Sequence, residues 1–339
     1  MYFPMWSTLC IMNVIPGDRR TAILAAVTSF LLGCLFLLAG QKLAALFLSC
    51  HERFDLLNPK VLCHQSTRQG EWDYEPLRDV LAAKKEQWKR AGTLAHLSIY
   101  FRNLDYGQRF VIGEYDKFHP ASLLKVPVMV ATLHEGDRDP QFLDRTLSST
   151  GAFPPRMMSV DEAEESILPN TEYTIRELLQ KMIVYSDNYS AKLLIEKLNT
   201  IPSPVAYHTF LDLDVLAMMN DPDADYISMQ SYANLFSMLY NAGYLSHRLS
   251  QLALELLSQT TYRDGLVAGV PANVRVAHKF GFRKVQNGEV QLHDCGIVYH
   301  PSASYVLCVM TSGFDVQQEG AVIADISRTV YDTISALDL

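Results

Sequence analysis

The stretch from Thr21 to Gly40 is the feature of this 339-residue sequence that most restricts how its first part can fold. It reads TAILAAVTSFLLGCLFLLAG, twenty residues without a charge. At a rise of about 1.5 Å per residue, such a helix is roughly 30 Å long, close to the thickness of the hydrocarbon core of a bilayer. Apolar residues resume after Gln41 and Lys42. We therefore expect a membrane anchor over residues 21–48.

Two arginines set the expected orientation of this anchor. Arg19 and Arg20 stand immediately before the apolar run, and positive charges are retained on the cytoplasmic side of a membrane. We expect residues 1–20 in the cytoplasm and a single-pass protein of the cell membrane with an extracytoplasmic domain. A cleaved signal peptide is the alternative, and the length of the apolar region favours an uncleaved anchor. The sequence leaves open whether the chain begins at Met1 or at Met12.

The charge and the cysteine content exclude several classes of protein. With 29 Lys and Arg against 37 Asp and Glu, the formal net charge is −8, which argues against a nucleic-acid partner because phosphate binding needs a basic surface. The six cysteines and ten histidines form neither a CxxC nor an HExxH pattern, so we expect no metal and no cofactor. Cys295 and Cys308 lie on either side of a predicted hairpin. An exported protein permits a disulfide, but the spacing does not assign one.

The remainder of the chain alternates between helical and strand periodicities. Residues 49–74 are polar and mixed and are expected to form a tether. Helices are predicted at 75–91, 121–136, 174–198, 231–242, 249–257 and 320–337, and strands at 94–101, 108–113, 274–282, 290–300 and 304–313. This order favours an α+β fold in which both ends of the chain complete one antiparallel, five-stranded sheet with helices on its faces.

The first candidate for chemistry is a serine and a lysine at the start of the apolar helix predicted over 121–136. Ser122 and Lys125 are three residues apart, so on a helix their side chains share one face. A lysine can take the proton of a serine only when it is neutral, and apolar burial near a second cation lowers its pKa. Ser122 is therefore a candidate nucleophile with Lys125 as its base. The alternative is an ordinary helix-start serine beside a lysine whose ammonium reaches solvent.

Two further motifs carry candidate functional groups. Ser186 and Asn188 interrupt a helical pattern, where the hydroxyl can relay a proton to a leaving amine and the amide can bind a substrate carbonyl. The alternative is a helix cap, since Ser, Asp and Asn are favoured there. In the strand predicted over 274–282, Lys279 can present a charge to an anionic substrate, and Gly281 lets a substrate backbone lie against the strand edge. The alternative is an ordinary strand with a solvated lysine.

The three motifs, in this order, resemble those of the class A β-lactamase-like serine hydrolases and the penicillin-binding proteins. The resemblance covers the chain from about Glu75 to the C-terminus. FHPASLLKVPVMVAT resembles the nucleophile helix, LLQKMIVYSDNYSAKLLIEKL the SDN helix, and RVAHKFGF, DCGIVYH and SYVLCVMTSG the three closing strands. It implies a catalytic domain over residues 75–339, in which an all-helical subdomain accompanies the five-stranded sheet.

The resemblance also implies a role for each motif residue. Ser122 would be the acylated nucleophile, Lys125 its base and Ser186 the proton relay. Asn188, Lys279 and Gly281 would bind the substrate, and the backbone N–H groups of Ser122 and Phe282 would form the oxyanion hole. The implied substrate is a β-lactam or a peptidoglycan-peptide-like molecule.

The chain departs from this family pattern at two places. Phe280 stands where the family usually has Thr or Ser, which removes a hydroxyl that helps to hold the β-lactam carboxylate. The stretch at 211–230, LDLDVLAMMNDPDADYISMQ, lacks the glutamate of the family's Glu-x-x-Leu-Asn loop, which activates the deacylating water. We interpret Asp221, Asp223 and Asp225 as solvated loop residues. Acylation is therefore expected, and deacylation is expected to be slow.

Three functional hypotheses follow from these residues. The leading one is a membrane-anchored serine acyl hydrolase of the β-lactamase-like group, facing outward. A D-Ala-D-Ala-directed penicillin-binding peptidase shares all three motifs and needs no deacylating glutamate. A non-catalytic module that only holds cell-wall peptides is the third, and the retained Ser122, Lys125, Ser186 and Lys279 argue against it.

Overall fold

The computed structural model of the protein describes residues 27–35, 37, 54–62, 72–113, 117–149, 166–201, 227–285 and 287–337. The chain divides into two compact units, Met1–Arg53 and Phe54–Leu339. In the first unit, residues 27–35 are helical. No helix within the described ranges is both long enough and apolar enough to cross a bilayer. Much of the predicted anchor, 21–48, and of the tether, 49–74, lies outside the described residues, so the anchor stays a prediction.

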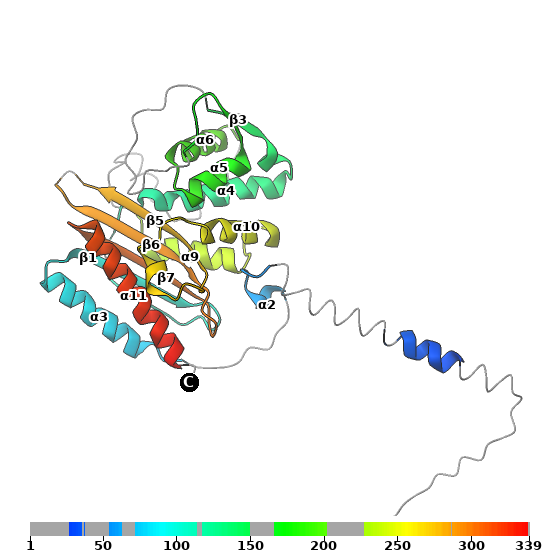
Figure 1. The fold of residues 1–339 in the computed structure, drawn as a ribbon, viewed down its shortest axis with the longest axis horizontal. Coiled ribbons are helices and arrows are strands. Elements are labelled where there is room, and N and C mark those ends of the chain that lie inside the picture. Colours follow the sequence, from blue (N-terminus) through cyan, green and yellow to red (C-terminus); the bar gives the residue numbers. More distant parts are fainter. Residues whose placement is uncertain are drawn as a thin grey trace, which may run out of the picture. The chain divides into compact units, whose positions relative to one another are not determined.

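The second unit is built on a five-stranded antiparallel sheet with the order β2-β1-β7-β6-β5 (Figure 1). Its strands are β1 (Leu94–Asn103), β2 (Arg109–Ile112), β5 (Val276–Lys284), β6 (Val290–Val298) and β7 (Tyr305–Gly313). The first hairpin of the domain pairs with its last strand, because β1 lies beside β7. The predicted α+β fold with one sheet completed by both ends of the chain is confirmed.

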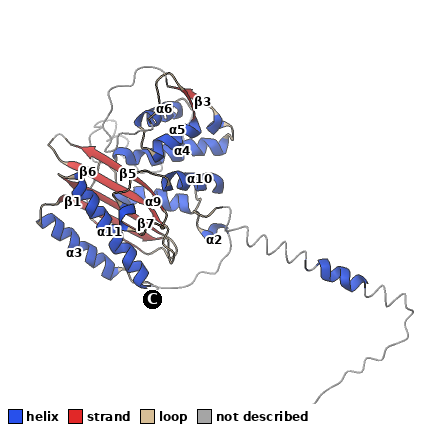
Figure 2. Ribbon diagram, in the orientation of Figure 1, coloured by secondary structure: helices blue, strands red, loops and turns tan. Residues whose placement is uncertain are grey.

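Helices cover both faces of this sheet (Figure 2). One face packs against α3 (Glu75–Arg90) and α11 (Val316–Leu337). The other packs against the helical subdomain, which comprises α4 (Lys125–Arg138), α5 (Ile175–Val184), α6 (Asn188–Asn199), α9 (Met229–Tyr240) and α10 (His247–Ser258). Shorter elements complete the unit: α2 (Pro59–Leu62), η1 (Ala121–Leu124), η2 (Phe142–Asp144), β3 (Thr146–Ser148), β4 (Glu172–Thr174) and η3 (Leu266–Gly269).

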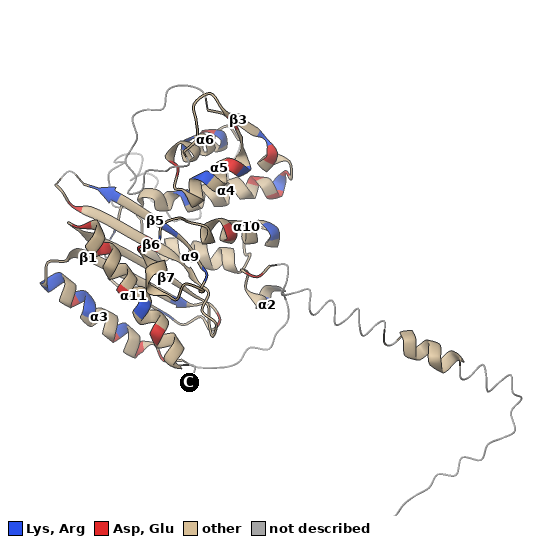
Figure 3. Ribbon diagram, in the orientation of Figure 1, with Lys and Arg blue, Asp and Glu red and all other residues tan. Residues whose placement is uncertain are grey.

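The strands divide their side chains between two cores. On β7, Val306, Cys308 and Met310 belong to the core shared with the helical subdomain, whereas Leu307 and Val309 belong to the core under α3 and α11. This alternation follows from the two-residue period of a strand. Because both faces are covered, β6 and β7 are buried along their whole length, and β7 carries no charged residue (Figure 3). The sheet is thus a rigid platform for residues at its edge.

Part of the segment that we expected in the tether belongs to the second unit. Leu56 and Leu57 are buried there, and the backbone N–H of Asn58 donates to the carbonyl of Tyr240 over 2.8 Å. Asp55 pairs with Arg275 at 2.6 Å. The compact unit accordingly begins at Phe54 rather than at Glu75.

Candidate active site

Ser122 lies on η1, the short 3-10 turn that leads into α4. The residue before it, Ala121, has a φ of +47°, a left-handed conformation that is uncommon outside glycine and that surrounding packing must hold in place. Lys125 begins α4, and its Nζ lies 2.9 Å from Oγ of Ser122. Pro127 falls in the first turn of α4, where its missing N–H removes no helical hydrogen bond.

The SDN motif forms the turn between α5 and α6. Ser186 is buried in a left-handed conformation with a φ of +58°. Asp187 caps α6, since its carboxylate accepts the N–H of Ser190 over 2.8 Å and the hydroxyl of Ser166 over 2.7 Å. The motif is therefore both a helix cap and part of the site. The cap fixes the backbone that presents Ser186 and Asn188 to Lys125.

Lys125 is surrounded by groups that suit a neutral amine. Its Nζ donates to the carbonyl oxygen of Ser186 and to Oδ1 of Asn188, each over 2.6 Å. Neither oxygen can donate a hydrogen bond, so these two contacts take both hydrogens of an uncharged amine. The lone pair then remains for the hydroxyl of Ser122. Burial lowers the pKa of Lys125 to about 7, against an opposing effect of the carboxylate of Asp187.

Lys279 is surrounded by groups that suit an ammonium. Its Nζ donates to Oγ of Ser186 over 3.0 Å and to the carbonyl of Phe280 over 3.2 Å, and it lies 4.2 Å from the centre of the Phe280 ring. All three N–H bonds of a charged amine therefore have an acceptor or an aromatic face. Burial lowers the pKa of Lys279, the neighbouring Lys125 lowers it further, and the carboxylate of Asp294 opposes both effects.

Ser186 connects the two lysines. Its Oγ lies 3.1 Å from Nζ of Lys125 and 3.0 Å from Nζ of Lys279. A hydroxyl has one hydrogen, so Ser186 can accept from a charged Lys279 and can donate to a neutral Lys125 when the lone pair of that amine is not engaged by Ser122. Lys279 is itself fully buried. Its Nζ therefore contacts Ser186 from inside the protein, whereas we had expected it to be presented directly to a substrate.

The remaining predicted residues line the same region. Asn188 is exposed at the start of α6. Gly281 is buried on β5, and a Cβ there would lie 2.9 Å from the carbonyl oxygen of Pro120, so glycine allows β5 to approach the Ser122 turn closely. Phe282 follows on the same strand, which brings its backbone beside that turn. The structure thus brings Ser122, Lys125, Ser186, Asn188, Lys279, Gly281 and Phe282 together.

Phe280, the departure from the family pattern, is buried in the core under α3 and α11. Its ring stacks on Tyr262 with the centroids 4.3 Å apart. The side chain therefore stabilises β5 and carries Lys279 over its ring. Residues 202–226, which include Asp221, Asp223 and Asp225, lie outside the described residues, so the interpretation of these aspartates stays a prediction.

Sequence reasoning missed two groups of residues near the site. Asp187 is not among the predicted site residues, although the helix-cap alternative for its motif is correct and its charge lies next to Lys125. His278 and Asp294 carry no local signal at all, since their contact depends on how β5 pairs with β6. The capping preference of Asp was the one sequence signal that could have drawn attention to Asp187.

Comparisons with known proteins identify the family. A family model described as the beta-lactamase enzyme family matches residues 82–334. The chain belongs to the beta-lactamase enzyme family. A beta-lactamase of Bacteroides uniformis is 26% identical over 250 residues, which are 68% of this chain and 83% of that protein. The class A β-lactamase-like resemblance stated from the motifs is confirmed.

Solved structures show how far the β-lactamase fold extends over this chain. A class A beta-lactamase from Mycobacterium abscessus matches with a TM-score of 0.62 and 21% identity, covering 75% of this chain and 99% of that chain. A variant of PBP-A, solved as an acyl-enzyme complex with penicillin G, matches with a TM-score of 0.59 and 22% identity. The match covers 77% of this chain and 97% of that chain. At these identities the likeness establishes the fold.

Proposed function

We propose that this β-lactamase family member is a serine acyl hydrolase that is acylated at Ser122 by β-lactams or by peptidoglycan-peptide-like substrates. The contact between Nζ of Lys125 and Oγ of Ser122, 2.9 Å long and partly buried, carries the proposal. It places a nucleophile beside an amine whose two hydrogens already have acceptors. That arrangement meets the requirement for activating a serine hydroxyl, a base within hydrogen-bond reach.

Acylation transfers one proton from Ser122 to the leaving amine. Oγ of Ser122 attacks the carbonyl carbon and its proton moves to Nζ of Lys125. The negative charge that develops on the carbonyl oxygen is held by the backbone N–H groups of Ser122 and Phe282. The C–N bond then breaks, the nitrogen takes the hydroxyl proton of Ser186, and Lys125 returns a proton to Ser186. An ester at Ser122 and a free amine result, and both lysines are as they began.

A D-Ala-D-Ala-directed peptidase is the second candidate function. One observation favours it, the lack of glutamate between positions 211 and 230. β-Lactam hydrolysis needs a base for the deacylating water, whereas a peptidase substrate can use Lys125 once its proton has passed to the departed amine. Under this candidate, β-lactams are slowly released inhibitors rather than substrates.

We further propose an extracytoplasmic location, with the chain held by the apolar segment at 21–48. The location is supported by the disulfide between Cys295 and Cys308, because disulfides persist in oxidising compartments. Fractionation of cells into cytosol, periplasm or medium, and membrane tests it. Recovery of the protein in the cytosolic fraction would contradict it.

Intact-mass spectrometry after incubation with benzylpenicillin tests the proposed function. The expected spectrum shows one covalent adduct on the full chain and none on Ser122→Ala. Ser258→Ala, at the end of α10, is the matched control and should keep the adduct. An adduct on Ser122→Ala would remove Ser122 from its role. A wild-type protein that binds peptidoglycan peptides but forms no adduct would support the binding module instead.

A further inference from the structure

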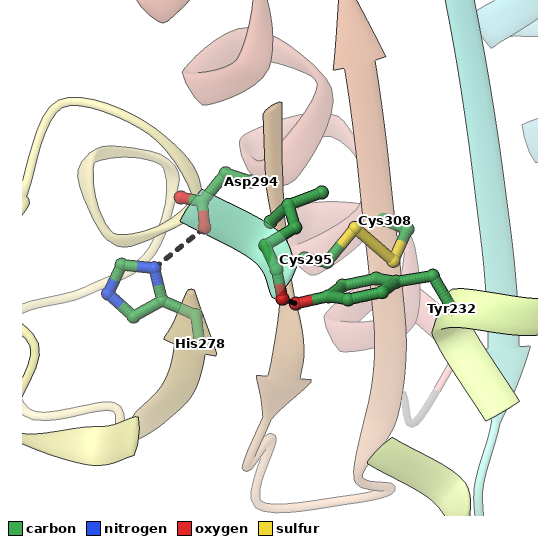
Figure 4. Close-up of a disulfide and its surroundings, with 6 residues drawn as sticks. Tyr232, His278, Asp294, Cys295 and Cys308 are labelled. Atoms are coloured by element: carbon green, nitrogen blue, oxygen red, sulfur yellow. Dashed lines mark hydrogen bonds and ion pairs between the residues drawn. A yellow bond between two sulfur atoms is a disulfide. The ribbon is translucent and has the colours of Figure 1, made fainter. Parts of the chain in front are cut away.

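A buried histidine–carboxylate pair lies directly behind Lys279. Nδ1 of His278 is 2.7 Å from Oδ1 of Asp294, and both side chains are at most 1% exposed (Figure 4). Asp294 also accepts the backbone N–H of Leu266 over 2.9 Å. None of these groups takes part in the acylation chemistry described above. A fully buried ionisable pair is costly unless something compensates it, so its presence here calls for a role.

The surrounding backbone leaves room for this pair. On β6, Gly296 stands opposite His278, and a Cβ there would lie 2.5 Å from Cβ of His278. A Cβ at Gly265 would collide with Oδ2 of Asp294. Glycines on two separate elements therefore accommodate the two side chains.

The hydrogen bonds of the pair indicate a net negative charge. Nε2 of His278 is buried and has no hydrogen-bond partner among the described residues. A proton there would be an unpaired buried donor, so the ring is neutral with its single proton on Nδ1, donated to Asp294. Asp294, with the donors His278 and the Leu266 N–H, is then the carboxylate anion. The pair as a whole carries one negative charge.

That negative charge lies on strand positions adjacent to that of the buried cation, on the other face of the sheet. Asp294 is opposite Phe280 in the pairing of β5 with β6, and His278 is the residue before Lys279. Within the described part of the chain, no carboxylate lies at ion-pair distance from Lys279. Burial and the charge of Lys125 lower the pKa of Lys279, and Asp294 is the carboxylate whose charge opposes that lowering.

The pair is also tied to the turn that bears Ser186. The carbonyl of His278 accepts the hydroxyl of Thr260 over 2.9 Å, and the next residue, Thr261, donates its N–H to the carbonyl of Val184 over 3.1 Å. Val184 ends α5, two residues before Ser186. The strand segment that holds Lys279 and the turn that holds Ser186 are thus connected through two threonines.

We propose that His278 and Asp294 are positioning residues of the active site, a buried anion that keeps Lys279 as the charged amine behind Ser186 and leaves Lys125 as the amine that accepts the proton. The inference rests on the proposed acylation of Ser122 and adds two residues to it. Without the anion, Lys279 would lose its proton, and with it the attraction for a negatively charged substrate.

Asp294→Asn tests the role, since it removes the charge and keeps the shape. Acylation of the full chain is followed by mass spectrometry with benzylpenicillin and with its methyl ester, which lacks the carboxylate. Loss of one unit charge across about 6 Å is worth about a hundredfold in relative rate at an effective dielectric constant near 20. We expect the acid-to-ester ratio of acylation efficiencies to fall by about that factor.

Glu319→Gln is the matched control. Glu319 is another buried carboxylate, which accepts the hydroxyl of Thr311 over 2.7 Å and the N–H of Leu292 over 3.2 Å. No contact between Glu319 and Lys279 or His278 is found among the described residues. The acid-to-ester ratio of acylation efficiencies in Glu319→Gln should therefore stay at the wild-type value. The inference would be overturned if Asp294→Asn lowered the acylation efficiency equally with the acid and with the ester, or lowered neither. A wild-type protein that neither compound acylates would refute the proposed function instead.

A double-mutant cycle keeps the inference testable if Asp294→Asn folds poorly. Removing only one member of a buried charge pair leaves an uncompensated charge, whereas removing both does not. Thermal unfolding of Asp294→Asn, Lys279→Met and the double variant should therefore show the double variant more stable than the sum of the single effects. Additive effects would show that the two charges do not interact.

Discussion

Burial lowers the pKa of both amines next to Ser186, but the two amines have different neighbours. Nζ of Lys125 contacts four oxygens, Oγ of Ser122, Oγ and the carbonyl of Ser186, and Oδ1 of Asn188, whereas Nζ of Lys279 contacts two oxygens and the ring of Phe280. The pKa of Lys125, lowered to about 7, puts the neutral form of the base within the physiological range. Under the proposed function, the same residue type serves as a base at one position and as a fixed cation at the other.

The first prediction concerns the pH dependence of acylation. Below pH 7 Lys125 is protonated and cannot accept the Ser122 proton, so the acylation rate should rise as pH increases through about 7 and then level off. Stopped-flow acylation between pH 5 and 9 measures the profile. Lys125→Arg should abolish acylation because guanidinium stays charged, and Lys192→Arg, exposed on α6, should not change it. A flat profile would assign the base to another group.

The second prediction concerns Phe280. Replacing it with threonine restores the family's hydroxyl but removes a buried ring that stacks on Tyr262. Large-to-small substitutions of buried aromatic residues cost about 3–5 kcal/mol, so Phe280→Thr should lower the free energy of unfolding by about that amount. Urea denaturation measures the loss. Phe314→Thr, at a residue that is 65% exposed, is the control and should stay within about 0.5 kcal/mol of wild type.

At the scale of elements, β6 and β7 are joined covalently as well as by hydrogen bonds. Cys295 and Cys308 stand directly opposite each other in the strand pairing, 13 residues apart in sequence, and form a disulfide (Figure 4). Cys295 is also opposite Lys279 on β5. Directly opposite residues share a face of the sheet, so the disulfide lies beside the buried lysine.

The third prediction follows from the length of the loop that this disulfide closes. Cross-linking a loop of about 15 residues stabilises a fold by roughly 3 kcal/mol. The double substitution Cys295→Ala and Cys308→Ala should therefore lower the free energy of unfolding by about 2–4 kcal/mol. Urea denaturation with and without a reductant measures it, and reduced wild type should match the variant. Cys34→Ala, at a free cysteine, is the control. Equal stability of oxidised and reduced wild type would contradict the prediction.

At the scale of the whole molecule, the proposed function assigns acylation and turnover to different parts of the chain. The acylation groups come from η1, α4, the turn before α6 and β5, all inside the described domain. The family's deacylating glutamate would fall in the stretch at 211–230, which contains none. General-base help to the attacking water is typically worth about 10²–10⁴ in rate, so release of the acyl group should be the slow step.

The fourth prediction is a rapid first turnover, a burst, in the hydrolysis of a cephalosporin. Mixing the full chain with a chromogenic cephalosporin in a stopped-flow instrument should show a rapid phase equal to the enzyme concentration, followed by a slow steady state. Ser122→Ala should show neither phase. Rapid linear hydrolysis without a burst would contradict the prediction and would point to Asp221, Asp223 or Asp225 as the missing base.

Much of the fold and the first pair of the site could be predicted from the sequence, because they depend on neighbours along the chain. Strand and helix periodicities predicted the five strands and the principal helices within a few residues, since alternation and 3.6-residue spacing are local properties. Ser122 and Lys125 were expected to touch because three residues on a helix bring two side chains to one face. The link from these residues to Ser186 and Lys279 came from the resemblance to a family.

Only the tertiary structure decided the charge of the site. Lys279 is 93 residues from Ser186, and its complete burial follows from packing β5 against the Ser122 turn at Gly281. His278 meets Asp294 because β5 and β6 pair in one register, and a shift by one residue would move every side chain to the opposite face. The packing of Leu56 depends on a contact with Tyr299, which is 243 residues away in sequence. Such contacts arise from the whole packed chain, and no local pattern records them.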